Sequence, residues 1–67
     1  MQLKVFVNGE ATVTNAATLA ELVAQFGFAE TGVATAVNGD FVPRGARQST
    51  QLAGDDEVEI VSPRQGG

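Results

Sequence analysis

Apolar residues occupy every second position over residues 3–7, and the polar Lys4 lies between two of them. A period of two is the pattern of a strand that buries one face. Asn8-Gly9 follows directly, and this dipeptide favours a type I′ turn because both of its residues adopt positive φ readily. Residues 10–13 are suited to the returning strand. The first 13 residues therefore predict a β-hairpin.

The spacing of apolar residues becomes helical in the next segment. Four apolar residues lie at i, i+3, i+4 and i+7, namely Leu19, Leu22, Val23 and Phe26. This is the stripe by which a helix packs against a core. Thr18 is placed as the N-cap, Glu21 completes a capping box, and Gly27 is placed to end the helix. We expect one helix of about eight to ten residues.

A second pair of strands is predicted around Asn38-Gly39. Residues 33–37 form the third strand, and residues 40–42 pair back briefly before Pro43, which lacks the N–H that a sheet requires. The alternation leaves open which face of residues 33–37 points inward. Phe41 is either an exposed residue or an anchor in the core.

The remaining segment predicts a loop and a final strand. Residues 44–51 are polar, with a short helical turn expected around Ala46. Leu52 is a candidate core residue contributed by this loop. Residues 57–61 alternate again, with Val58 and Ile60 as the apolar side of the last strand.

The order of elements is strand, strand, helix, strand, short strand and last strand. This order predicts an α+β fold of the β-grasp, ubiquitin-like type, a roll with a mixed sheet of four to five strands and one main helix on one face. The first and last strands would lie side by side in the middle, and the other sheet face would be left to solvent. We expect one domain over residues 1–62 and a flexible tail over residues 63–67.

The composition excludes several functions. The chain has no cysteine, histidine, tyrosine or tryptophan, so the usual general base, thiol nucleophile and metal ligands are missing. We therefore expect a protein that is not an enzyme and that binds no metal or cofactor itself. The net charge is −4, and the basic residues are scattered: Lys4, Arg44, Arg47 and Arg64. Such a distribution does not favour nucleic-acid binding.

The N-terminal segment also bears on location. It is an alternating strand pattern without a long apolar run, which predicts neither a signal peptide nor a membrane span. We expect a cytoplasmic protein.

The sequence ends on Gly66-Gly67. Two terminal residues without side chains can enter a narrow cleft, and glycine adopts φ values that are closed to other residues. A terminal carboxyl group is ionised at neutral pH, so it can attack a phosphate but resists attack itself. The end of the chain is thus a candidate for chemical modification by another protein's active site.

Taken together, these segments resemble a sulfur carrier protein of the thiamine pathway, within the ubiquitin-like β-grasp group. The resemblance covers essentially the whole chain. It rests on the Asn8-Gly9 hairpin, the helix segment TLAEL, the run AVNGDFVPR, the strand segment GDDEVEI and the tail SPRQGG. Each segment by itself points only weakly to this family, whereas their combination is specific to it. Arg64 is a departure, because a hydrophobic residue would suit the family at this place.

The resemblance implies that the protein is a sulfur carrier and not a catalyst. An ATP- and Mg²⁺-dependent activating enzyme would adenylate the carboxylate of Gly67, and a persulfide sulfur supplied by a cysteine desulfurase would convert it to a thiocarboxylate. Thiazole synthase would then take the sulfur for the thiazole ring. ATP and Mg²⁺ belong to the partner. Pro63, Arg64, Gln65 and Gly66 would thread into the partner's cleft.

The folded body is expected to supply specificity. If the apolar positions of the first strand face the helix, Phe6 points to the open face of the sheet, and Val61 on the last strand is expected near it. Exposed apolar groups on a sheet face often mark docking sites. We therefore predict that Phe6 and Val61 belong to a partner-docking surface, and that Glu59 belongs to it as an acidic residue that pairs with arginines of the partner.

Other functions fit parts of the same pattern. The small subunit of molybdopterin synthase, or a carrier for another sulfur metabolite, would share the fold and the tail chemistry. A ubiquitin-like covalent modifier is a second class; Lys4 is the only lysine, so self-linkage would have few sites. A non-catalytic interaction module with an inert tail is a third class. The sulfur acceptor separates the sulfur carriers from one another, a stable link to other proteins indicates a modifier, and the absence of any modification indicates an inert module.

Overall fold

The computed structural model describes residues 2–28 and 32–62, and over these residues it contains a five-stranded sheet, one α-helix and one 3-10 helix. The strands are β1 (Leu3–Val7), β2 (Glu10–Thr14), β3 (Ala34–Val37), β4 (Asp40–Val42) and β5 (Glu57–Val61). The helices are α1 (Leu19–Gln25) and the 3-10 helix η1 (Arg44–Ser49). The predicted tail over residues 63–67 lies outside the described residues.

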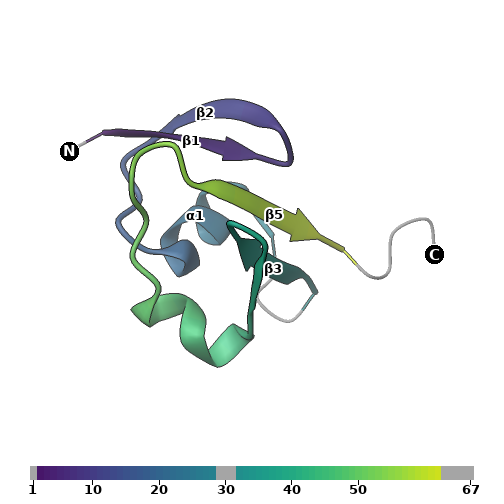
Figure 1. Cartoon of the computed structure of the whole chain (residues 1–67). Helices are drawn as coiled ribbons and strands as arrows, with labels where there is room; N and C mark the ends of the chain where they lie inside the picture. Colours follow the sequence, from purple (N-terminus) through teal and green to yellow (C-terminus); the bar gives the residue numbers. More distant parts are fainter. Residues whose placement is uncertain (1, 29–31, 63–67) are drawn as a thin grey trace.

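The strands form one mixed sheet in the order β2-β1-β5-β3-β4. β1 and β5 are parallel neighbours at its centre, with Phe6 opposite Glu57, whereas the other pairs are antiparallel. Helix α1 covers one face of this sheet (Figure 1). The predicted β-grasp architecture, including the central pairing of the first and last strands, is confirmed.

Both predicted Asn-Gly turns are present. Asn8 and Gly9 have φ values of 51° and 87°, and Asn38 and Gly39 have φ values of 52° and 88°. Positive φ at both central residues defines the type I′ turn, whose twist matches that of the strands it joins. The two hairpins therefore form where local sequence predicts them.

The α-helix is shorter than predicted and has defined caps. The Oγ1 atom of Thr18 accepts a hydrogen bond from the N–H of Glu21, as expected of an N-cap. The return bond differs from a standard capping box, since the Glu21 carboxylate accepts from the N–H of Ala17 at 2.7 Å. At the other end Gly27 has φ of 78°, and the bonds from Gly27 and Phe28 to the last helical turn form a Schellman motif.

The core lies between α1 and one face of the sheet. Its buried apolar residues are Val5, Val7, Ala16, Leu19, Leu22, Val23, Val42, Leu52, Val58 and Ile60. Leu52 therefore fills the core from its loop, as predicted. Thr35 is buried, and Val33 and Val37 pack against the core, which settles the inward face of residues 33–37.

Phe26 lies differently from expectation, and Phe41 takes one of the two positions that the sequence left open. Phe26 was expected in the buried stripe of the helix, but it is the C-cap residue and is 41% exposed, stacked on Phe28. The helix ends before its fourth stripe position reaches the core. Phe41 was a candidate core anchor but is 69% exposed. Its neighbour across the sheet is Ala36, on the face away from α1, so the core is not open to it.

A buried arginine was not predicted. Arg47, on η1, is 3% exposed. Its Nε donates to the Thr35 hydroxyl at 3.1 Å, and its Nη2 donates to the carbonyl of Val33 at 2.7 Å. The Thr35 hydroxyl in turn donates to the carbonyl of Val42 at 2.8 Å. One side chain thereby joins η1 to β3 and, through Thr35, to β4.

Replacing Arg47 by alanine should lower the free energy of unfolding by about 2–4 kcal/mol, since the Thr35 hydroxyl and the Val33 carbonyl lose a charged donor and the packed aliphatic stem is lost. Urea denaturation followed by circular dichroism measures this change. Arg44→Ala is the matched control, because Arg44 is exposed on the same 3-10 helix. It should change the unfolding free energy by less than about 0.5 kcal/mol. Equal losses in both variants would contradict the role assigned to Arg47.

Candidate functional site

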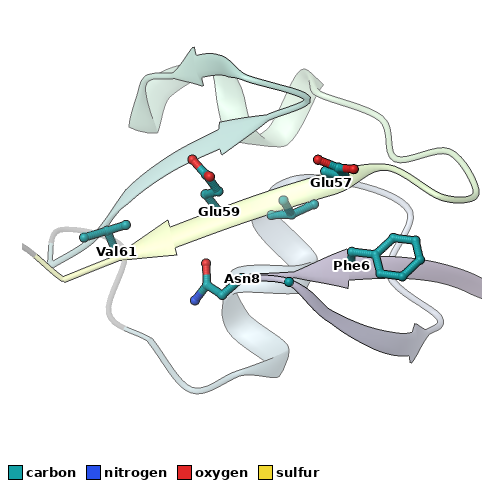
Figure 2. Close-up of a pocket in the computed structure, with 7 residues that line it drawn as sticks. Phe6, Asn8, Glu57, Glu59 and Val61 are labelled. Atoms are coloured by element: carbon teal, nitrogen blue, oxygen red, sulfur yellow. The ribbon is translucent and has the colours of Figure 1, made fainter.

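The face of the sheet opposite α1 carries a groove of about 570 Å³. The groove is lined by residues from β1, the first turn and β5: Phe6, Asn8, Gly9, Glu57, Val58, Glu59 and Val61. These residues define the open-face groove. Figure 2 shows it from the open side, with α1 behind the sheet. The groove follows β5, the strand that leads into residues 63–67.

The structure brings the three predicted docking residues onto this one face. Phe6 and Val61 are not adjacent, however. Phe6 is opposite Glu57 in the parallel ladder, and Val61 lies four residues further along β5, about 13 Å away. They lie at opposite ends of the groove, with Glu59 between them (Figure 2). The expectation that Val61 lies beside Phe6 is therefore corrected to a shared groove.

The groove combines apolar ends with acidic side chains: Glu59 lies between the two ends, and Glu57 lies at the Phe6 end (Figure 2). Val61 is 57% exposed, and both Glu57 and Glu59 are exposed. Lys4 lies over the Phe6 ring at 5.3 Å from its centroid and forms an exposed ion pair with Asp55 at 3.7 Å. Interactions of this exposed kind contribute little to stability. The surface presents apolar contact area and negative charge that a partner could match.

Asn8 completes the hydrogen bonding of β5 in this groove. The N–H of Phe6 donates to the carbonyl of Asp56, and the N–H of Asn8 donates to that of Val58, both at 2.8 Å. The chain then turns away. The Asn8 carboxamide supplies the next two bonds itself, accepting from the N–H of Ile60 at 2.9 Å and donating to the Ile60 carbonyl at 3.1 Å.

Asn38 does a similar task at the other end of β5. Its side-chain oxygen accepts from the N–H of Glu57 at 2.9 Å, and its backbone N–H donates to the Glu57 carbonyl at 2.7 Å. Its amide nitrogen also donates to the Asp56 carboxylate at 3.0 Å. Sequence reasoning assigned both asparagines to turns and missed these bonds. The signal was present, since asparagine occupies both turns where aspartate or glycine would also suit the backbone.

The predicted tail residues cannot be placed in this site. Pro63, Arg64, Gln65, Gly66 and Gly67 lie outside the described residues. Strand β5 ends at Val61, and the described structure extends to Ser62, the residue directly before Pro63. Among the described residues, no group of three or more acidic side chains is arranged to hold a metal ion. Within residues 2–28 and 32–62, no helix has the length and hydrophobicity that a bilayer span requires.

The mixed sheet, the single covering helix and the central parallel pair define a ubiquitin-like β-grasp protein. The structure is similar to the crystal structure of a thiamine biosynthesis protein (ThiS) from Geobacter metallireducens, with a TM-score of 0.79 and 26% sequence identity. The match covers 97% of this chain and 100% of that one. No curated protein matches the sequence.

The sequence also matches the model of the ThiS family over residues 2–67. The chain therefore belongs to the ThiS family, the β-grasp sulfur carriers of thiamine biosynthesis. Proteins of this type are small protein substrates rather than catalysts. The resemblance drawn from the hairpins, the helix and the last strand is confirmed.

Neighbouring positions on β5 should differ sharply in their effect on stability, because Ile60 is 4% exposed in the core and Val61 is 57% exposed on the groove. Ile60→Ala should lower the free energy of unfolding by about 2–4 kcal/mol through the cavity that it leaves. Val61→Ala should cost less than about 1 kcal/mol. Urea titration of both variants measures the difference. Similar costs would mean that β5 does not present these two faces.

Proposed function

We propose that this protein carries sulfur as a thiocarboxylate on the carboxyl group of Gly67 and delivers it for formation of the thiazole ring of thiamine. The observation that carries the proposal is the family match, which extends from residue 2 to Gly67 and so includes the diglycine. The open-face groove supports it as a surface on the strand that leads into the tail.

The chemistry requires activation by another protein. A carboxylate oxygen of Gly67 attacks the α-phosphorus of ATP and displaces pyrophosphate, which gives an acyl adenylate. A persulfide sulfur, derived from a cysteine desulfurase, then attacks the carbonyl carbon and expels AMP. Cleavage of the resulting S–S bond by a second thiol leaves the thiocarboxylate and a disulfide. Every step needs groups that this chain lacks, since it contains no cysteine or histidine.

The chain itself contributes a tail long enough to enter a partner's cleft and a terminal carbonyl that no side chain obstructs. Five residues from Pro63 to Gly67 span at most about 17 Å when extended, which is enough to place the carboxylate inside a cleft while the folded body docks outside. Side chains at residues 66 and 67 would obstruct the carbonyl carbon under attack. ATP and Mg²⁺ are bound and used by the activating enzyme, where positive charge stabilises the transferring phosphoryl group.

In this function the activating enzyme docks on the open-face groove. Phe6 and Val61 offer apolar contacts at its two ends, and Glu57 and Glu59 offer charge to basic residues of the partner. The reaction needs ATP and free thiols, so we place it in the cytoplasm, where thiols stay reduced.

Incubation with the activating enzyme, ATP and a persulfide donor should raise the intact mass by one exchange of oxygen for sulfur. Intact-mass spectrometry measures the change. The chain lacking Gly67 should show no exchange, although it should keep the circular dichroism spectrum and the urea midpoint of the full chain. An unchanged mass for the full chain would refute the carrier function. Sulfur transfer to thiazole synthase, and not to the large subunit of molybdopterin synthase, should identify the acceptor.

Val61→Asp should raise the KM of the activating enzyme for this protein about tenfold, because a charge replaces an apolar contact in the groove. Steady-state pyrophosphate release measures the effect. Val13→Asp is a matched control, since Val13 is 59% exposed on the same sheet face but lies outside the groove, on β2. Its KM should stay within about twofold of the unmodified value. Equal effects at both positions would argue against docking in the groove.

A further inference from the structure

We infer that Asn8 is a positioning residue for the reaction at the chain end: its carboxamide holds the last part of β5 and so sets the direction in which the tail leaves the docking face. The inference rests on the proposed function, because it assumes that residue 67 reacts in a partner's cleft. It concerns a side chain that the proposed chemistry itself does not use.

Strand β5 is supported differently on its two sides. β3 pairs with β5 as far as Val61, where Ala34 is the partner. On the opposite side, the ladder to β1 includes only Glu57 and Val58. The backbone of Ile60 would therefore lack partners on the β1 side, at the part of the strand nearest the tail. The Asn8 carboxamide provides both of the missing bonds.

The chemistry of the side chain explains why asparagine suits this position. A carboxamide carries an acceptor and a donor in one plane, as a peptide group does, so it can meet the N–H and the C=O of the same residue. Aspartate in its ionised form would set an acceptor against the Ile60 carbonyl. Glycine would keep the turn, because φ of 51° at position 8 is open to it, but would leave Ile60 without these two bonds.

The position of Ile60 makes such support important for the reaction. From residue 60 to residue 62 the extended chain spans about 7 Å. A change of about ten degrees in the direction of β5 would then displace the start of the tail by about 1 Å relative to the docked body, and misplacement by about 1 Å can already slow a reaction strongly. Asn38 holds β5 at Glu57, so its loss leaves the tail end of the strand supported.

This contrast gives a matched pair of variants, Asn8→Gly and Asn38→Gly. Each keeps a type I′ turn and removes carboxamide bonds to β5, at opposite ends of the strand. With the activating enzyme, Asn8→Gly should lower kcat about tenfold while KM stays within about twofold, because docking persists and placement of the carboxylate suffers. Asn38→Gly should leave both constants within about twofold. Both assays are run well below each variant's unfolding midpoint.

Three results would overturn the inference. A similar fall in kcat for both variants would show that Asn8 acts through general stability. An unchanged kcat for Asn8→Gly would show that the bonds between the Asn8 carboxamide and Ile60 do not matter to the reaction. A raised KM at unchanged kcat would make Asn8 a docking contact.

A second measurement does not depend on turnover. Backbone NMR order parameters of Val61 and Ser62 should fall in Asn8→Gly and stay unchanged in Asn38→Gly. Unchanged values in both variants would refute the positioning role. If the unsubstituted protein is not modified by the activating enzyme, the proposed function fails, and these order parameters still decide whether Asn8 directs the end of β5.

Discussion

The structure depends on the placement of β5 between β1 and β3. This strand joins the β1–β2 and β3–β4 hairpins into one sheet, and its inward side chains, Val58 and Ile60, are buried in the core. Its pairing with β1 joins residues separated by about fifty positions, so the pairing closes a long loop at a cost in conformational entropy. The same strand presents alternate residues to the open-face groove and continues into the tail. The core, the open-face groove and the residues that precede the tail thus share one element, and a shift of β5 would affect all three.

The two Asn-Gly turns illustrate how one short motif serves two purposes. Locally, each supplies the positive φ values that a tight hairpin requires. At long range, the side chains of Asn8 and Asn38 bond to opposite ends of β5. The second role suits a small domain, because a chain of this length buries a modest core and must satisfy its central strand with few residues. A turn residue that also completes a sheet adds support without additional chain.

The sheet also separates the core from an exposed, partly apolar face. One face, covered by α1 and supported by the buried Arg47, contains the core, while the other face keeps apolar side chains such as Phe41 and Val61 exposed. Substitutions on the open face should therefore cost little stability. Under the proposed function this separation lets the surface that meets the partner enzymes vary without constraint from core packing.

The sequence by itself determined the elements and the class of protein. Alternation defined the strands, the Asn-Gly dipeptides defined the hairpins, and Thr18 and Gly27 marked the helix ends, because these features depend on neighbouring residues. Only the tertiary structure decided that Phe26 and Phe41 are exposed, that Thr35 faces inward and that Arg47 is buried. It also decided that Phe6 and Val61 lie at opposite ends of one groove and that Asn8 completes β5. Those outcomes depend on which distant segments meet, and the register between strands is set by the packing of the whole chain and not by local spacing.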